Sequence, residues 1–359
     1  MSDIFTQMSL DNHEQVVFCN DKNSGLKAII AVHNTILGPS LGGCRMYPYA
    51  SEAEAMTDVL RLSKGMTYKA AVAGLNLGGG KSVIIGDPKK IANEGLFRTF
   101  GRFVNSLNGK YITAEDVGTN VRFMEWVSYE TKHVTGIPIC FGGSGDPSPF
   151  TAHGTFCGIK SAIKKLKNSD SLDGVKVAVE GIGNVGYHLC KELHENGAKL
   201  YVSDIDQAAI NRAVEEFNAI AVKCEELYSL DVDVYAPCAL GATVNDKTLP
   251  QLKCAIIAGA ANNQLKDETK HAAELQKRGI LYAPDYVINA GGLINVYTEI
   301  GGGGKDYAWN KSEEIYNTLL EIYNLAEKEN ITTAAAANKL AEKRIASVAL
   351  TKNIYRGKK

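Results

Sequence analysis

The first 135 residues alternate between short β-like runs and longer segments with helical periodicity. Gly25–Thr35 is rich in β-branched and apolar residues, which predicts a strand. A helix is predicted from Ser51, a suitable N-cap with Glu54 three residues later. The segments GLFRTFGRFVNSLNG (95–109) and KYITAEDVGT (110–119) predict a second amphipathic helix and then a strand that runs into an acidic turn. The apolar positions of the first helix recur at helical spacing: Ala55, Met56, Val59, Leu60 and Leu62.

From residue 150 onward the pattern becomes a regular alternation of strand and helix. A helix is predicted over 150–166, and strand, glycine turn, helix and strand follow between Val175 and Asp204. A tail from Lys311 to Ile354 is also predicted to be helical. This alternation is typical of a doubly wound parallel sheet. Further short apolar strands are predicted within 232–237, 254–261 and 280–292.

A segment rich in Gly, Ser and Pro, GGSGDPSP (Gly142–Pro149), is the clearest candidate for a hinge. The chain has 359 residues, a length that suits two domains. We therefore expect an α/β protein of two domains separated by a cleft. The first is an α/β domain over 1–147, and the second is the doubly wound domain over 148–331. The C-terminal helix, about 332–359, is expected to pack back on the first domain.

Composition and charge narrow the range of partners. The formal net charge is −1 and no basic block is present, so neither nucleic acid nor a membrane surface is an expected partner. The N-terminus lacks the apolar core of a signal peptide, and a cytoplasmic location is expected. The eight cysteines form no C-x-x-C pair, which indicates reduced and mostly buried thiols. The seven histidines form no ligand cluster, and no metal site is predicted.

A dinucleotide-binding fingerprint, GIGNVG, follows the predicted strand Val175–Val179 and opens a helix. Gly181, Gly183 and Gly186 provide the turn and the close backbone approach that a pyrophosphate requires, and the helix N-terminus meets its negative charge. The next strand ends in Asp204, whose carboxylate can accept hydrogen bonds from an adenosine ribose. That carboxylate would repel a 2′-phosphate, and no Arg or Lys follows closely. The second domain is therefore predicted to be a Rossmann domain that binds NAD in preference to NADP.

A second glycine-rich stretch, LNLGGGKSVIIGDP (Leu75–Pro88), places Lys81 at the start of a strand that is predicted to be buried. A run of three glycines suggests either a tight turn or close approach by a ligand. Lys69 is expected just after the first helix, and Asp116 ends another strand. Together these three residues suit a small anionic substrate, because one lysine can hold a carboxylate while a desolvated one acts as a base. The aspartate can shuttle protons.

The glycine-lysine stretch resembles the signature of the glutamate/leucine/phenylalanine/valine dehydrogenase superfamily. Further matching motifs occur in family order over nearly the whole chain, and the resemblance is closest to the leucine-type members. It implies oxidative deamination, in which an L-amino acid, NAD and water give a 2-oxo acid, ammonium and NADH. It also implies a homo-oligomer: an octamer is expected, as in leucine-type relatives, and a dimer, as in some valine-type ones, is the alternative. The matching motifs are GPSLGGCRM (38–46), MTYKAAVAGL (66–75), TAEDVGT (113–119), GIGNVG (181–186), GAANNQL (259–265) and NAGGLINV (289–296).

The resemblance also implies a role for individual residues. Lys69 would pair with the substrate α-carboxylate, Lys81 would activate water, and Asp116 would exchange protons with the amino group. The glycines before Lys81 would let substrate and nicotinamide come close to it. The implied substrate-binding residues are Leu41, Gly42, Gly43, Met66, Lys69, Ala114, Leu293 and Val296. The implied cofactor-binding residues are Thr151, Gly181, Gly183, Asn184, Val185, Gly186, Asp204, Ala239 and Asn262.

Side-chain selectivity is expected to favour aliphatic amino acids. Glutamate-specific relatives typically carry lysine at the position of Leu41 and serine at that of Val296, so a buried γ-carboxylate would lack a partner here. Ala114 and Leu293 would complete an apolar wall. Leu293 resembles the phenylalanine-type choice, whereas Ala114 resembles the leucine type. Leucine is the expected preference, with valine and isoleucine also accepted and a valine- or phenylalanine-preferring enzyme as the alternative.

Two other classes of protein remain to be weighed. A non-catalytic NAD-binding sensor would not require Lys69, Lys81 and Asp116 together. An NADP-linked biosynthetic glutamate dehydrogenase conflicts with Leu41, Val296 and Asp204. We therefore expect a branched-chain amino-acid dehydrogenase.

Overall fold

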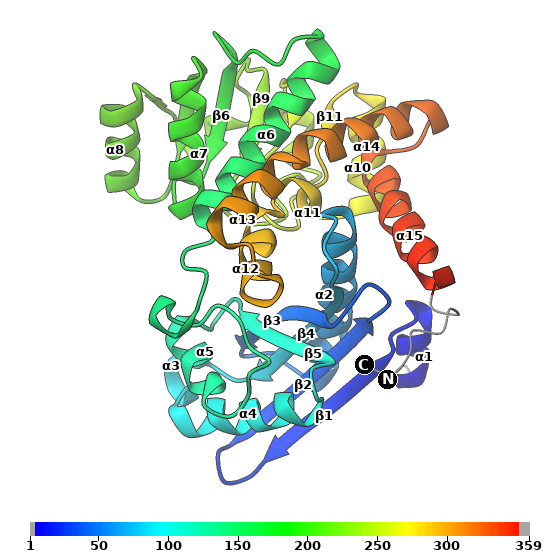
Figure 1. Ribbon diagram of the computed structural model, residues 1–359. Helices are drawn as coiled ribbons and strands as arrows, with labels where there is room; N and C mark the ends of the chain where they lie inside the picture. The colour runs from blue at the N-terminus through cyan, green and yellow to red at the C-terminus, as the bar shows by residue number, and fades with distance from the viewer. Residues whose placement is uncertain (1–3, 352–359) are drawn as a thin grey trace. The chain divides into compact units, whose positions relative to one another are not determined.

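The computed structural model describes residues 4–351, which divide into two compact units (Figure 1). The first unit comprises residues 4–145, Val296–Gly302 and residues 341–351. The second comprises Asp146–Asn295 and Gly303–Leu340. The division after Gly145 falls inside the segment predicted as a hinge.

The first unit is built on a five-stranded mixed sheet with the order β1-β2-β4-β3-β5. The pairs β1/β2 and β2/β4 are antiparallel, whereas β3/β4 and β3/β5 are parallel. The predicted strand at 25–35 is present as β2. The strands are β1 (Gln15–Asp21), β2 (Leu26–Asn34), β3 (Ser40–Tyr47), β4 (Gly78–Ile85) and β5 (Tyr111–Glu115).

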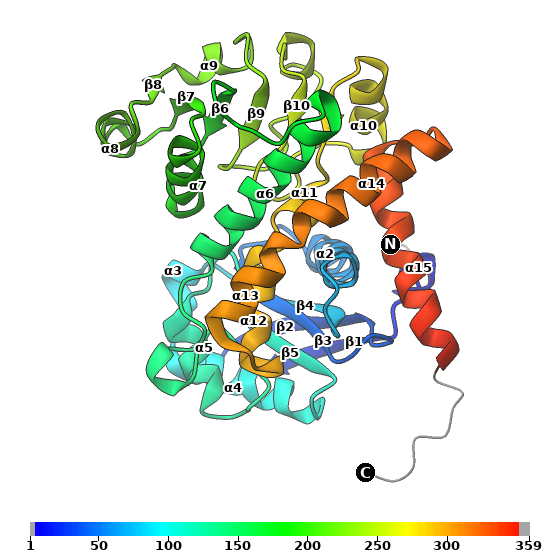
Figure 2. The ribbon, with the colours of Figure 1, turned by 45° about the horizontal axis from the view of Figure 1, so that its top comes forward.

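Both faces of this sheet are covered. Apolar residues occupy successive positions of β2, and successive side chains of a strand point to opposite faces. Ile29 and Ala31 pack with residues of helix α2 (Glu52–Val72), whereas Ile30 and Val32 belong to the opposite core. Figure 2 shows α2 on one face of the sheet and α4 and α5 on the other. The remaining helices of this region are α1 (Ile4–Leu10), α3 (Pro88–Ile91), α4 (Glu94–Ser106), α5 (Val121–Ser128) and the 3-10 turn η1 (Ile139–Phe141).

Helix α2 begins where the sequence predicts, since the Ser51 side chain caps it by accepting a hydrogen bond from the Glu54 amide. Two expectations near it are wrong. Lys69 does not follow the helix but lies in its last turn. The glycines before Lys81 are not a turn at the mouth of a strand, because β4 already begins at Gly78 and Lys81 is its fourth residue.

The second unit contains a six-stranded sheet in which every strand pair is parallel. Its order, β11-β10-β9-β6-β7-β8, proceeds outward from the β6/β9 pair in both directions, as a doubly wound sheet does. The α/β prediction is therefore confirmed. The strands are β6 (Lys176–Glu180), β7 (Lys199–Ser203), β8 (Ile220–Ala221), β9 (Val234–Pro237), β10 (Ile256–Ile257) and β11 (Leu281–Tyr282).

The predicted strand over 280–292 is only partly correct. β11 ends at Tyr282, and the chain then turns at Pro284 into two helices. Buried apolar residues lie on both sides of this turn. Their sequence therefore shows neither the alternation of a strand nor the spacing of a helix with one exposed face. The helices that begin in this unit are α6 (Ser148–Lys167), α7 (Asn184–Glu195), α8 (Gln207–Phe217), α9 (Cys224–Leu227), η2 (Leu249–Gln251), α10 (Glu268–Lys277), α11 (Asp285–Ile288), α12 (Gly291–Gly301), α13 (Gly304–Glu313), α14 (Ile315–Glu329) and α15 (Thr333–Thr351).

The C-terminal region is helical as predicted, up to the end of α15 at Thr351, and Ile354 lies outside the described residues. The end of α15 belongs to the first unit. There the Arg344 guanidinium donates to the backbone carbonyls of Ala71 and Leu75 at 3.0 and 2.8 Å. The Ala71 carbonyl lies in the last turn of α2, and Leu75 lies in the segment that follows this helix.

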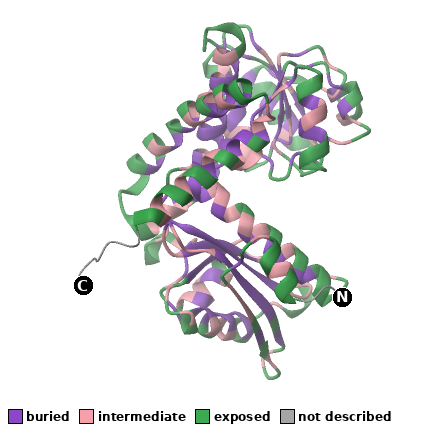
Figure 3. Ribbon diagram, turned by 90° about the vertical axis from the view of Figure 1, so that its right-hand side faces the viewer, coloured by how far each residue is buried: buried purple, intermediate pink, exposed green. Residues whose placement is uncertain are grey.

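Burial is concentrated in the strands of both sheets (Figure 3). All eight cysteines are free thiols, and Cys140 is exposed. Over residues 4–351, no helix combines the length and apolar character needed to cross a membrane.

Candidate active site

One face of the first unit's sheet gathers the predicted substrate-side residues. The strand register pairs Gly43 with Ala114, Leu41 with Gly79, and Lys81 with Ala31. Paired residues of neighbouring strands point to the same side of a sheet. Ala31 packs against α2, so Leu41, Lys81 and Ala114 face the side that this helix covers. Helix α2 carries Met66 and Lys69 in its last two turns, and both are half-buried.

The glycines of β4 allow close packing inside the protein. A Cβ on Gly79 would lie 2.1 Å from the Thr67 amide of α2, and one on Gly80 would lie 2.7 Å from the ring of Tyr111. A Cβ on Gly78 would meet the Asn34 carbonyl at 1.9 Å. The space beside these glycines is therefore filled by helix α2 and neighbouring strands. This is a different reason for the glycines than the expected room for substrate and nicotinamide.

Gly42 and Gly43 of β3 have different surroundings. The Gly42 carbonyl accepts a hydrogen bond from the Tyr111 hydroxyl at 2.6 Å, on the face away from α2. A Cβ on Gly43 would lie 2.8 Å from the Cβ of Asp116. Gly43 thus leaves the space in which Asp116 lies over β3.

Lys81 and Asp116 form a direct ion pair. The Lys81 Nζ lies 3.1 Å from Asp116 Oδ2, and Lys81 is only 5% exposed. Burial by itself raises the pKa of Asp116, but the nearby Lys81 and Arg45 outweigh it and hold that pKa below its ordinary value. The carboxylate is therefore ionised at neutral pH. The two predicted catalytic residues come together although 35 positions separate them in the chain.

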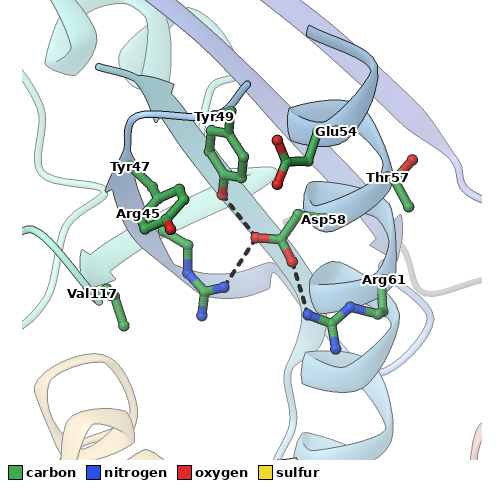
Figure 4. A pocket seen from close by; sticks show the side chains of 8 residues that line it. All are labelled: Arg45, Tyr47, Tyr49, Glu54, Thr57, Asp58, Arg61 and Val117. Carbon is green, nitrogen blue, oxygen red and sulfur yellow. Dashed lines mark hydrogen bonds and ion pairs between the residues drawn. The ribbon is translucent and has the colours of Figure 1, made fainter. Parts of the chain in front are cut away.

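Arg45 is a third member of this group that the sequence analysis missed. Its Nε lies 2.9 Å from the same Asp116 Oδ2, and its Nη1 lies 3.0 Å from Oδ2 of Asp58 on α2. Asp58 also accepts hydrogen bonds from the Tyr49 hydroxyl at 2.7 Å and from Arg61 at 2.9 Å (Figure 4). The only available signal was the position of Arg45 inside the motif GPSLGGCRM.

The pocket drawn in Figure 4 has a volume of about 480 Å³ and lies beside this group. Its lining combines two arginines with two carboxylates. None of the residues predicted to bind substrate or to catalyse lines it, so we do not assign it to substrate. The lining residues are Arg45, Tyr47, Tyr49, Glu54, Thr57, Asp58, Arg61 and Val117.

The loop that carries Asp116 is fastened to β3. The Thr119 hydroxyl donates to the Cys44 carbonyl at 2.9 Å and accepts from the Asp116 amide at 2.8 Å. Gly118 has φ +80°, and a Cβ there would lie 2.0 Å from the Met46 carbonyl. These contacts hold the backbone of Asp116 in place before any substrate binds.

Val296 lies on α12 in the part of that helix that belongs to the first unit. One turn later, the Glu299 carboxylate accepts hydrogen bonds from the amides of Gly136 and Ser144, the shorter being 2.8 Å from Ser144. These bonds fix the helix segment that carries Val296. Leu293 lies on the same helix in the second unit, where it is buried.

The second unit places the glycine fingerprint at the carboxyl end of β6, where the strand order reverses. This is the position at which doubly wound sheets bind ligands. Gly181 has φ +94°, and a Cβ on Gly186 would lie 2.0 Å from the Gly181 carbonyl. Both positions therefore require glycine. The Asp204 carboxylate accepts hydrogen bonds from the amides of Ile182 at 2.5 Å and Asp206 at 2.8 Å, which turns it toward the loop.

The N-terminus of α7 fits a phosphate group. No side chain caps this 12-residue helix, and a Cβ on its N-cap Gly183 would meet nothing within 4 Å. Uncapped amides with open space in front of them suit an anion. Gly183, Asn184 and Val185 are the residues that would hold a pyrophosphate there.

Three further predicted cofactor residues are found in the second unit. Ala239 lies against the loop, since a Cβ on Gly181 would be 2.6 Å from it. The Asn262 side chain is exposed and accepts a hydrogen bond from Asn289 at 2.8 Å. The Thr151 hydroxyl donates to the Pro147 carbonyl at the start of α6. Among the described residues no group of His, Cys, Asp and Glu is suited to hold a metal ion.

Comparisons with known proteins identify the family of the chain. A family model described as Glu/Leu/Phe/Val dehydrogenase, dimerisation domain, matches residues 13–133. A second, described as Glutamate/Leucine/Phenylalanine/Valine dehydrogenase, matches residues 142–213 and 201–355. The chain therefore belongs to the glutamate/leucine/phenylalanine/valine dehydrogenase family.

Individual relatives of the chain are dehydrogenases of particular amino acids. The chain is 55% identical to leucine dehydrogenase of Bacillus cereus over 98% of its own length and 96% of that protein. It is 56% identical to leucine dehydrogenase of Geobacillus stearothermophilus over 96% and 93%. The crystal structure of L-tryptophan dehydrogenase from Nostoc punctiforme is similar with a TM-score of 0.87 and 48% identity, over 96% of this chain and 99% of that one. The protein is an amino-acid dehydrogenase of a family that uses NAD or NADP.

Proposed function

We propose that the protein catalyses the reversible NAD-dependent oxidative deamination of branched-chain L-amino acids, with leucine preferred and valine and isoleucine also accepted. In the forward direction an L-amino acid, NAD⁺ and water give a 2-oxo acid, ammonium, NADH and a proton. The observation that carries the proposal is the ion pair between the buried Lys81 and the half-buried Asp116, in a chain that is 55% identical to a leucine dehydrogenase.

The site residues divide substrate binding and proton transfer between them. Lys69 pairs with the α-carboxylate of the substrate, and Asp116 accepts a proton from its amino group. NAD, when bound, accepts hydride from the α-carbon. Lys81, which is nearly excluded from solvent, then takes a proton from water as the water attacks the imino carbon, and it stabilises the carbinolamine. Asp116 returns its proton to nitrogen and the C–N bond breaks. The carbinolamine hydroxyl proton passes to the departing ammonia, which leaves as ammonium, and Lys81 releases the proton taken from water to solvent.

NAD rather than NADP is the proposed cofactor. The Asp204 carboxylate lies next to the glycine loop and would repel a 2′-phosphate while accepting hydrogen bonds from a ribose hydroxyl. Thr151, Ala239 and Asn262 are proposed to contact the remaining parts of the cofactor.

Selectivity for aliphatic side chains is proposed to depend on Leu41, Ala114, Val296 and Leu293. A γ-carboxylate would find no cation on Leu41 or Val296, and an unpaired buried carboxylate costs several kcal/mol. A preference for valine or for phenylalanine is the alternative. The similarity to a tryptophan dehydrogenase supports only the preference for an aromatic substrate. We further propose that the protein is a cytoplasmic homo-oligomer, with an octamer expected.

The first experiment measures NADH formation at alkaline pH with leucine, valine, isoleucine, phenylalanine, tryptophan and glutamate, each with NAD and with NADP. We expect the highest kcat/KM for leucine with NAD, and no turnover of glutamate. A higher value for an aromatic substrate would contradict the proposed pocket, and turnover of glutamate would contradict the selectivity argument.

The role of Lys81 is tested in the same assay. Lys81→Ala should abolish turnover while leaving NADH affinity within about twofold, because the proposed cofactor contacts belong to residues of the second unit. Lys90→Ala is the matched control, since Lys90 is an exposed lysine of α3 paired only loosely with Asp87 at 3.8 Å. Equal activity of Lys81→Ala and Lys90→Ala would remove Lys81 from the mechanism.

A further inference from the structure

We propose that Arg45 is a positioning residue that shares Asp116 with Lys81 and thereby keeps Lys81 available as a base. The inference rests on the proposed function, in which Lys81 and Asp116 carry the proton transfers. It goes beyond that function because no role in the reaction has been assigned to Arg45.

The first argument is that both cations contact the same oxygen atom. Arg45 Nε and Lys81 Nζ lie 2.9 and 3.1 Å from Asp116 Oδ2. No side chain among the described residues hydrogen-bonds to Oδ1. The two contacts therefore fix the rotation of the carboxylate and leave Oδ1 to meet the amino group of a substrate.

The second argument concerns charge. A carboxylate that pairs with a single buried lysine stabilises its ammonium form and makes it a poor base. Here the negative charge of Asp116 is shared with a guanidinium that stays ionised. The guanidinium therefore offsets part of the attraction that Asp116 exerts on the Lys81 side chain.

The third argument is that Arg45 is itself held in place. Its Nη1 is paired with Asp58 at 3.0 Å, and Asp58 is fixed in turn by Tyr49 and Arg61 (Figure 4). A guanidinium that bridges two carboxylates has little rotational freedom. Since Asp58 lies on α2 and Asp116 follows β5, Arg45 joins the helix to the loop that carries the catalytic carboxylate.

The other titratable groups near Arg45, Asp116 and Lys81 do not exchange protons with the substrate. Burial raises the pKa of the Cys44 thiol to about 12, and burial also raises the pKa of Tyr111, so both stay neutral. The charged groups that face Asp116 are Lys81 from β4 and Arg45 from β3. Those that face Arg45 from α2 are Asp58 and, beyond it, Arg61.

The test compares the pH profiles of wild type, Arg45→Gln and Arg45→Lys in leucine oxidation. For Arg45→Gln we expect kcat to fall at least about tenfold, and the acidic limb of kcat/KM to move up by about one pH unit. KM for leucine should change less than about threefold, because Lys69 holds the substrate carboxylate. Arg45→Lys keeps the charge but cannot bridge two carboxylates. We therefore expect the acidic limb of kcat/KM at its wild-type pH, with kcat reduced about fivefold.

Arg98→Gln is the matched control. It removes a guanidinium from the same unit, and Arg98 pairs with Glu130 and Glu94 instead of Asp116. Near-UV circular dichroism verifies that each variant is folded. If Arg45→Gln does not fold, Arg45→Met takes its place, with the same fall in kcat and the same shift of the acidic limb expected.

The outcomes separate the two proposals. A wild-type kcat and acidic limb in Arg45→Gln would overturn the role of Arg45. So would a loss of kcat that leaves the limb in place and is equal in both Arg45 variants, because that result indicates a structural role only. A wild-type enzyme that does not oxidise any amino acid would instead overturn the proposed function.

Discussion

A single hydrogen atom in place of a methyl group at Gly79 decides how closely helix α2 approaches the sheet. The Cβ position of any other residue would overlap the Thr67 amide at 2.1 Å, and backbone cannot move aside as a flexible side chain can. Close approach of α2 in turn places Met66 and Lys69 over the same face as Lys81. At the scale of residues, Gly79 therefore limits how far α2, which carries Lys69, lies from β4, which carries Lys81.

Lys69 offers a test at this scale. Lys69→Ala should raise KM for leucine about 30-fold, equivalent to about 2 kcal/mol, and lower kcat much less, because the carboxylate contact exists before the reaction begins. Lys64→Ala is the control, since Lys64 is on the same helix and pairs with Asp11 at 2.6 Å. An unchanged KM in Lys69→Ala would remove Lys69 from carboxylate binding.

Between helix α2 and strand β2 lies a pair of buried histidines. Their rings are 4.7 Å apart, edge to face. His33 lies 2.7 Å from the Thr67 hydroxyl and donates to the Asp11 carbonyl at 2.9 Å. His13 lies 3.0 Å from both Ser63 Oγ and the Leu60 carbonyl. The pair links the helix to the strand without an ionic contact.

Burial lowers the pKa of both rings, and that of His33 falls to about 4, with His13 as a further cause. The folded state therefore binds these protons more weakly than the unfolded state does. The free energy of unfolding should be highest above the ordinary histidine pKa of about 6.5 and should fall as the pH drops toward 4. For His33 alone the loss is up to about 3 kcal/mol.

The measurement uses urea unfolding at pH 7.5 and pH 5 in a Trp309→Phe background, where Trp126 of the first unit is the remaining tryptophan. His33→Gln should be less stable than its parent at pH 7.5 but should lose less stability on going to pH 5. His188→Gln, in the second unit, should keep the pH dependence of its parent. Equal pH dependence in His33→Gln and its parent would show that His33 does not titrate with folding.

At the scale of the whole molecule, each unit carries a different part of the proposed chemistry. Lys69, Lys81, Arg45 and Asp116 belong to the first unit, and the glycine loop with Asp204 belongs to the second. Helices α12 and α15 contribute residues to both units. A change in conformation about Gly142–Pro149 is therefore the motion that we expect to gate the reaction.

Small-angle scattering tests that motion. NADH together with 4-methyl-2-oxopentanoate should lower the radius of gyration of each protomer, because closing a site around ligands makes a two-domain chain more compact. The Lys81→Ala variant provides a complex that cannot turn over. Superimposable curves with and without both ligands would count against closure.

Much of the fold follows from local pattern. The Ser51 cap of α2 and the strand-turn-helix with Gly181, Gly183 and Gly186 were predictable because their interactions join residues only a few positions apart. The region after Tyr282 was not, because residues buried on all sides lose the period that distinguishes strand from helix.

The candidate site divides in the same way. The sequence by itself determined the family and the glycine loop and selected Lys69, Lys81 and Asp116 as candidates, since motifs in order require no coordinates. Only the tertiary structure placed Lys81 against Asp116 and added Arg45 with its tether to Asp58. It also decided what the glycines of β4 contact. These contacts join residues of β3, β4, β5 and α2, which are far apart in the chain. Strand register and helix packing depend on the whole sheet, so neighbouring residues in the sequence do not determine them.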